Sequence, residues 1–185
     1  MVRSLLVFML LSGCALQPLA TTPQPVHTES ANFAMNGRIS VRHNGSRDSA
    51  GLRWIHRAQT DEMLLLTPLG QTAVRIYRDD HQATLDDGDR HYQDADVESL
   101  MTQVLGWSLQ LDELHRWVLG KAADSAALVE RDASGRLTLL RQDGWEVRYL
   151  AYADDKADSL PKRMQLSREK LQVILLMDEW EWSTE

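Results

Sequence analysis

The chain has one cysteine, Cys14, among its 185 residues, so it cannot close a disulfide bond of its own. Its six histidines show no His-x-x-x-His spacing, and without a second cysteine the other common zinc-binding pattern is missing too. The sequence has no Gly-x-Ser-x-Gly elbow and no glycine-rich phosphate loop. These absences argue against zinc enzymes, serine hydrolases and nucleotide-binding enzymes. We expect a protein without catalytic residues, bound metal or diffusible cofactor.

Positive charge is in the minority as well, since 20 lysines and arginines stand against 27 aspartates and glutamates, for a formal net charge of −7. A protein that binds nucleic acid needs a clustered basic face. An acidic chain is not drawn by charge to an anionic membrane surface either. The sequence therefore predicts no nucleic-acid partner, and any membrane contact must be made by a lipid or by apolar side chains.

The N-terminal apolar run, Leu5–Leu11, is far shorter than the roughly 20 residues that span a bilayer. It follows Arg3, and a short positive region before such a run is typical of a signal peptide. The stretch Leu11-Ser12-Gly13-Cys14 resembles the bacterial lipobox. This resemblance implies that residues 1–13 are removed and that Cys14 becomes the new N-terminus, with diacylglycerol on its thiol and an acyl chain on its amine. The alternative is an ordinary secretory signal, cleaved elsewhere, that leaves a free thiol.

The residue after the cysteine is Ala15. Many inner-membrane lipoproteins of enteric-type bacteria have aspartate there, so Ala15 points to the outer membrane. Residues 14–32 contain three of the five prolines and no apolar period, and we interpret them as the lipidated N-terminus and a tether. The remaining residues, 33–185, have the size of a single domain.

An apolar period of two dominates this domain. Phe33, Met35 and Ile39 fall on one side of a predicted strand, and the polar residues between them fall on the other. Turn signals such as Asn44-Gly45 and Asp143-Gly144 separate about ten short segments of this kind. The pattern predicts an antiparallel meander with one apolar face and one solvated face.

Two segments in the middle of the chain, 97–105 and 112–118, have apolar residues at helical spacing instead. We expect Asp96 and Gly106 to cap the first helix. For the second helix we expect Asp112 as the N-terminal cap and Gly120 as the stop. Both helices should bury their apolar stripes against the apolar face of the sheet.

Four segments in this order carry a resemblance to a known family. They are Leu65-Leu66-Thr67-Pro68-Leu69-Gly70, Leu114–Gly120, Gly144–Tyr149 and Leu160–Met164. Together with the lipobox they resemble the LolB family of outer-membrane lipoprotein receptors over about residues 33–182. Thr67 departs from the family pattern, in which asparagine is common at that position.

The resemblance implies a fold that is mainly β with α: a half-open antiparallel β-barrel of about ten or eleven strands, its concave apolar face covered by short helices. It also implies a receptor that is anchored in the inner leaflet of the outer membrane and faces the periplasm. Such a receptor accepts the acyl chains of other lipoproteins from a soluble LolA-like carrier and inserts these lipoproteins into the outer membrane. We expect a monomer. The alternative is a lipid-anchored envelope scaffold with a solid core and no lipid ligand.

The expected acyl-chain cavity is lined by apolar residues of the strands and of the second helix. These residues are Met35, Ile39, Leu52, Trp54, Leu64, Leu66, Val74, Ile76, Leu114, Trp117, Val118, Val147, Met164 and Leu166. Tryptophan and methionine suit a variable apolar ligand because they are large or adaptable. The pattern alone equally allows the same residues to fill a dry core.

Pro68, Leu69 and Gly70 favour a type I turn that places Leu69 at its tip. An apolar residue at an exposed tip calls for an explanation. The family resemblance implies a membrane-delivery turn, in which Leu69 projects toward the membrane. The alternative is a leucine that folds back onto the sheet.

Overall fold

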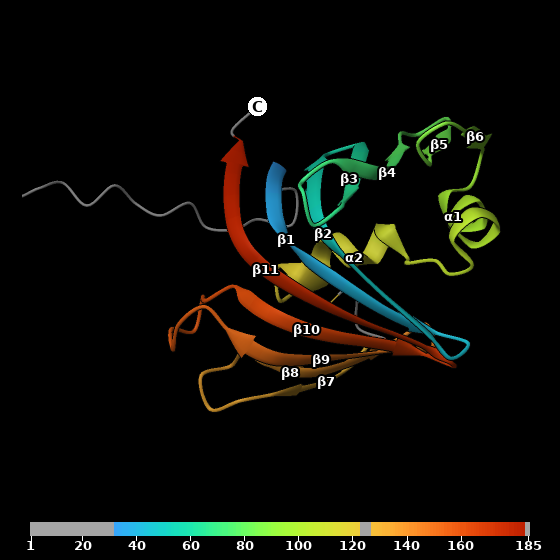
Figure 1. The fold of residues 1–185 in the computed structure, drawn as a ribbon. Helices are drawn as coiled ribbons and strands as arrows, with labels where there is room; N and C mark the ends of the chain where they lie inside the picture. Colours follow the sequence, from blue (N-terminus) through green and yellow to red (C-terminus); the bar gives the residue numbers. More distant parts are fainter. Residues whose placement is uncertain (1–31, 123–126, 184–185) are drawn as a thin grey trace, which may run out of the picture.

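The computed structural model describes residues 32–122 and 127–183 (Figure 1). The expected signal peptide, the lipidation site Cys14 and nearly all of the tether lie outside the described residues.

A single antiparallel sheet of eleven strands makes up most of the fold. The strands are β1 (Asn32–His43), β2 (Ser46–Arg57), β3 (Thr60–Leu66), β4 (Thr72–Arg78), β5 (Ala83–Asp86), β6 (His91–Asp94), β7 (Leu128–Arg131), β8 (Leu137–Gln142), β9 (Trp145–Tyr152), β10 (Pro161–Arg168) and β11 (Leu171–Ser183). Their order is β6-β5-β4-β3-β2-β1-β11-β10-β9-β8-β7, so only the central pair β1–β11 joins strands that are distant in the sequence. The expected fold class, mainly β with α in a half-open antiparallel arrangement of about ten or eleven strands, is confirmed by this open sheet and its two short helices.

The sheet is strongly curved, and its β2–β4 half faces its β8–β10 half across α2 (Figure 1). At the centre, the pairing of β1 with β11 changes register between Asn36 and Gly37. A Cβ atom on Gly37 would lie 1.9 Å from the carbonyl oxygen of Leu176, so only glycine fits there. Because a bulge bends its strand and increases the local twist, this irregularity helps to curve the middle of the sheet.

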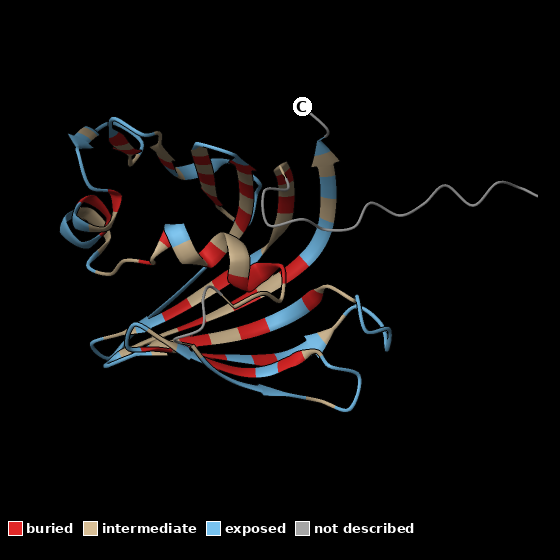
Figure 2. Cartoon of the chain, turned by 180° about the vertical axis from the view of Figure 1, so that it is seen from behind, coloured by how far each residue is buried: buried red, intermediate tan, exposed pale blue. Residues whose placement is uncertain are grey.

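The predicted alternation is confirmed in β1, where Phe33, Met35, Ile39 and Val41 are buried and the residues between them are less so (Figure 2). All four belong to the single core cluster of the described residues. That core extends from Phe33 to Met177, and both edges of the sheet lie within residues 32–183. A chain that begins at Ala15 therefore retains every strand and the whole described core.

Helix α1 (Val97–Leu105) has the predicted caps. The Asp96 carboxylate accepts hydrogen bonds from the backbone N–H groups of Glu98 and Ser99, and Gly106 ends the helix in the left-handed conformation at φ 78°. The helix packs against β5 and β6. Among the residues that the structure describes, no helix is long and apolar enough to cross a membrane.

Helix α2 (Leu111–Val118) begins two residues earlier than a cap at Asp112 predicts. Gln110 occupies the N-cap position, so the prediction that Asp112 caps this helix is wrong. Leu111 belongs to the helix because it extends the apolar stripe of Leu114 and Val118 at helical spacing. Asp112 lies in the first turn and pairs with a sheet residue, as described below. Gly120, at φ 72°, follows the end of the helix as expected.

Candidate functional site

The concave face of the sheet is covered by α2 (Figures 1 and 2). The buried residues of α2 form its apolar stripe and belong to the same core cluster as the buried residues of the sheet. The predicted cavity residues that this face brings together, all buried in one cluster with the α2 stripe, are Met35, Ile39, Leu52, Trp54, Ile76, Leu114, Trp117, Val118, Val147, Met164 and Leu166. Val74 is half-buried and packs against the same cluster. These side chains fill the space between the sheet and α2.

Leu64 and Leu66 do not belong to this cluster, so their placement in the predicted cavity is wrong. In β3 the buried positions are Asp61, Met63 and Leu65, and the two leucines between them point to the convex face. Leu64 pairs with Arg53 on β2 and with Arg75 on β4, both outward-facing positions. The register of the neighbouring strands decides the face, because a shift of one residue moves every side chain to the other side.

One carboxylate, that of Asp61, is buried on the concave face, where it is only 1% exposed. It accepts hydrogen bonds from Trp54 Nε1 and His56 Nδ1, both at 2.8 Å. Two guanidinium nitrogens of Arg78 lie 2.7 Å from its second oxygen. Burial works to raise the pKa of Asp61, but the hydrogen bond and charge of His56, the charge of Arg78 and the Trp54 bond outweigh it and hold the pKa below its usual value.

This buried cluster joins α2 to the sheet. Arg78 also binds the carboxylate of Asp112 in the first turn of α2. The ring of His115, one turn later, stacks on His56 with centroids 4.6 Å apart and an interplanar angle of 11°. Burial, with the nearby charge of His56, lowers the pKa of His115. The helix is thus held by an ion pair and a ring stack on one side and by its apolar stripe underneath.

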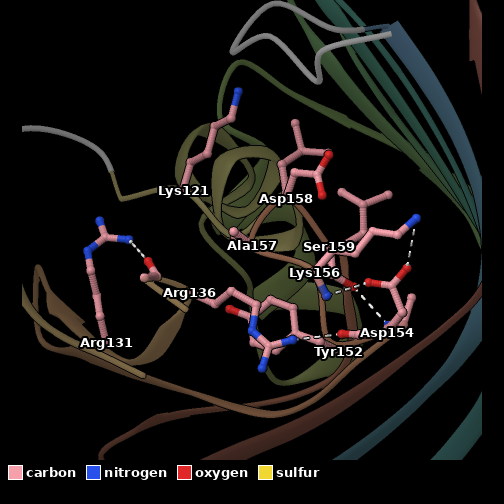
Figure 3. A pocket seen from close by; sticks show the side chains of 14 residues that line it. Lys121, Arg131, Arg136, Tyr152, Asp154, Lys156, Ala157, Asp158 and Ser159 are labelled. Carbon is pink, nitrogen blue, oxygen red and sulfur yellow. Dashed lines mark hydrogen bonds and ion pairs between the residues drawn. The ribbon is translucent and has the colours of Figure 1, made fainter. Parts of the chain in front are cut away.

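A pocket of about 430 Å³ lies beyond the C-terminal end of α2 (Figure 3). Its charged groups mainly bind one another and the backbone. Arg131 donates to the carbonyl oxygen of Gly135 at 2.8 Å, and Arg136 donates to the carbonyl oxygen of Asp154 at 2.7 Å. The guanidinium of Arg136 also lies over the ring of Tyr152, 4.7 Å from its centroid. These contacts fix the loops around the pocket.

The turn between β3 and β4 has the predicted geometry. Gly70 donates to the Thr67 carbonyl oxygen at 2.8 Å and has a φ of 79°, which suits glycine. Leu69 is 88% exposed, so it projects into solvent instead of folding back onto the sheet. The Thr67 hydroxyl accepts a hydrogen bond from the backbone N–H of Gln71 at 3.2 Å. A threonine thus supports the turn in this chain.

Sequence reasoning missed the polar cluster under α2. A signal for it was available, because Asp61 stands two residues before Met63 and His56 two residues after Trp54, which puts both polar residues on apolar strand faces. The structure pairs these two positions directly across β2 and β3. Arg78 and Asp112 could not be joined to them from spacing alone, because they come from a third strand and a helix.

Comparison with known proteins shows which family this chain is similar to. The family model "Outer membrane lipoprotein LolB" matches residues 31–180. The chain is 36% identical over 192 residues to the outer-membrane lipoprotein LolB of Nitrosomonas europaea, an alignment that covers 96% of this chain and 91% of the relative. It is 35% identical over 174 residues to LolB of Azoarcus sp., covering 93% of this chain and 90% of the relative.

Among solved structures, a LolA superfamily protein from Nitrosomonas europaea is similar in fold, with a TM-score of 0.52 over 86% of this chain and 90% of that chain at 10% identity. The chain therefore belongs to the family of the outer-membrane lipoprotein LolB, whose members are lipoprotein receptors of the outer membrane and not enzymes.

Proposed function

We propose that this protein takes the acyl chains of lipoproteins from a LolA-like periplasmic carrier into the space beneath α2 and then releases them into the inner leaflet of the outer membrane. Membership of the LolB family implies that the protein interacts with such a carrier and with lipoproteins. The observation that carries the proposal is an apolar concavity whose cover is one short amphipathic helix. The protein acts as a monomer that Cys14 anchors through its lipid.

The energies of the exchange are of the same order. Holding one acyl chain of about fifteen methylenes in water costs roughly 12 kcal/mol, at about 0.8 kcal/mol per methylene. The four buried side chains of the α2 stripe, Leu111, Leu114, Trp117 and Val118, contribute roughly 6–12 kcal/mol together if each is worth about 1.5–3 kcal/mol. An acyl chain from water can therefore replace the stripe on the sheet with a net gain of roughly 0–6 kcal/mol, well below the roughly 12 kcal/mol that its burial alone would give. The site can therefore shield the acyl chain from water and still release it.

Because the protein's own side chains fill the concavity, acyl chains enter only when α2 moves. The sheet remains as the wall, with methionine and tryptophan side chains that adapt to chains of varied shape. The contacts that hold α2 on its polar side, Arg78–Asp112 and His56–His115, are few and lie at one edge of the helix. After their release, α2 is still held by its apolar stripe, which an acyl chain can replace, and by the hydrogen bond that Tyr149 Oη donates to the Trp117 carbonyl oxygen at 3.1 Å.

Release into the membrane is assigned to the β3–β4 turn. Leu69 stands in solvent on a rigid turn, and burying a leucine side chain in lipid stabilises contact by about 1.5–3 kcal/mol. That is enough to favour brief contact with the bilayer and too little to fix the protein there. The turn thus brings the domain to the bilayer surface without becoming a second anchor.

The movement of α2 is tested by tying the helix to the sheet. In a chain that starts at Ala15 there is no cysteine, so Arg78→Cys and Asp112→Cys give one reactive pair. A short, cleavable crosslinker between them should abolish uptake of a fluorescent fatty acid, and cleavage of the linker should restore it. The same double variant before crosslinking is the matched control, because it lacks the ion pair equally.

Transfer from the carrier should follow the same pattern. A LolA-like protein loaded with a lipoprotein should pass its cargo to the uncrosslinked variant and not to the crosslinked one. Full uptake and full transfer with α2 tied down would show that acyl chains bind elsewhere, and the proposed site would be abandoned.

A further inference from the structure

A second hollow, which we call the mouth pocket, is lined by α1, by the α1–α2 connection and by the turns that join β1 to β2 and β10 to β11. These elements can be followed in Figure 1. Its volume is about 910 Å³, within the roughly 300–1,000 Å³ typical of small-ligand sites. Trp145 forms part of its wall and also belongs to the core cluster under α2. The mouth pocket therefore borders the space proposed for the acyl chains.

Trp145 is 2% exposed, and its indole N–H has no hydrogen-bond partner among the described residues. The neighbouring Trp117, whose ring centroid is 6.0 Å away, has a buried indole N–H that lacks a partner within the same described part of the chain. A buried donor without an acceptor is costly, so native structures nearly always satisfy such groups. Two adjacent buried donors at the border of an apolar site suit a ligand with carbonyl acceptors next to its hydrocarbon.

The charges of the mouth pocket favour a neutral polar group over an anionic one. Asp96, Glu98 and Glu169 contribute three carboxylates, against the two cations Arg168 and Lys170. The Arg168 guanidinium lies over the Trp145 ring, 5.8 Å from its centroid. Burial, together with the charge of Asp96, raises the pKa of Glu98, so further negative charge is already disfavoured here.

We infer that the mouth pocket binds the ester and amide carbonyls of the cargo's acylated cysteine, with Trp145 Nε1 in its wall as the donor. Trp117 Nε1 is not part of the wall and lies deeper, in the core beside Trp145. This inference rests on the proposed function, since it supplies the polar end of the same ligand. A triacylated cysteine has ester and amide carbonyls and no phosphate, whereas a phospholipid of the surrounding membrane carries an anionic phosphate. The mouth pocket thereby selects lipoprotein over membrane lipid.

The test uses the chain from Ala15 and three probes with octanoyl chains, each used below its critical micelle concentration. The probes are a triacylated cysteine tetrapeptide, octanoate and a phosphatidylglycerol, each measured by displacement of a fluorescent fatty acid. Wild type should bind the tetrapeptide more tightly than the phosphatidylglycerol. Trp145→Phe should weaken tetrapeptide binding about two- to tenfold, the weight of one neutral hydrogen bond, and leave octanoate binding unchanged. Trp180→Phe, at a half-buried tryptophan of β11 outside the mouth pocket, is the matched control and should change neither.

The indole N–H resonance of Trp145 in the unsubstituted protein gives a readout that does not depend on the folding of a variant. It should shift when the tetrapeptide binds and stay in place with octanoate. Two results overturn this inference alone, because acyl binding is still seen in both. One is an indole resonance that does not shift when the tetrapeptide binds. The other is a Trp145→Phe variant that binds the tetrapeptide as tightly as wild type does. Equal weakening of octanoate and tetrapeptide also overturns it, since the ester and amide carbonyls of the acylated cysteine would then add nothing to what a simple fatty acid already makes with Trp145. Wild-type protein that binds none of the acyl probes overturns the proposed function and this inference together.

Discussion

Replacing Asp61 with asparagine tests the buried cluster that joins α2 to the sheet. The substitution keeps the size of the side chain and one oxygen acceptor, but turns an NH₂ group toward donors of Arg78, His56 or Trp54. Removing one partner of a buried ion pair costs about 3–5 kcal/mol. Arg78 is 23% exposed and keeps Asp112, so we expect a loss of about 2–4 kcal/mol in the free energy of unfolding at neutral pH.

The assay is urea unfolding of the chain from Ala15, followed by tryptophan fluorescence, with the loss read from the midpoint at constant slope. Glu62→Gln is the matched control, because this neighbouring carboxylate pairs with Arg75 at the surface and should contribute less than about 1 kcal/mol.

The pH dependence follows from the low pKa of Asp61. Its stabilising effect is complete above the usual aspartate pKa of about 3.9 and disappears as the pH falls through the lower value of the folded protein. Wild type and Asp61→Asn should therefore converge only in strong acid. An Asp61→Asn protein within about 0.5 kcal/mol of wild type at neutral pH, or a gap that does not narrow in acid, would refute this account of the cluster.

Three further predictions concern the bend of the sheet at Gly37, the β3–β4 turn and helix α2. Gly37→Ala should lower the free energy of unfolding by at least about 2 kcal/mol, because its Cβ would lie 1.9 Å from a carbonyl oxygen of β11; a melting temperature equal to wild type would contradict this. Leu69→Glu should leave stability within about 0.5 kcal/mol of wild type and slow lipoprotein transfer to vesicles, whereas transfer at the wild-type rate would remove the turn from the mechanism. The pKa of His115 is lowered, so its neutral form stabilises the fold above about pH 6.5 and this stability is lost as the pH falls below that value. Uptake of a fluorescent fatty acid should consequently speed up in mild acid, and a His115→Gln variant should show a flatter pH profile.

The parts of the fold that the sequence predicts well are those set by local chemistry. The alternation in β1, the Asp96 and Gly106 caps and the Pro68–Gly70 turn depend on residues close together in the chain, and the structure has them as predicted. The start of the second helix was predicted two residues too late, because Asp112 is a good cap by type and only the packing of Leu111 reveals where α2 begins.

The sequence could not predict which residues of β3 point to the concave face, for a different reason. Met63–Leu66 is apolar throughout, so alternation gives no information, and only the pairing with β2 and β4 turns Leu64 and Leu66 outward. The polar cluster likewise depends on contacts between distant segments. The sequence therefore predicts most of the apolar residues on the concave face, but not the polar cluster that joins α2 to the sheet.

The most direct test of the account is the position of the acyl chain itself. With a deuterated protein whose valine, leucine and methionine methyl groups are protonated, nuclear Overhauser effects from a bound octanoyl chain can be assigned residue by residue. We expect them at Val147, Met164 and Leu166 on the concave face, and none at Leu64 on the convex face. Contacts confined to Leu64 and other surface methyl groups, with the concave methyl groups silent, would contradict the account.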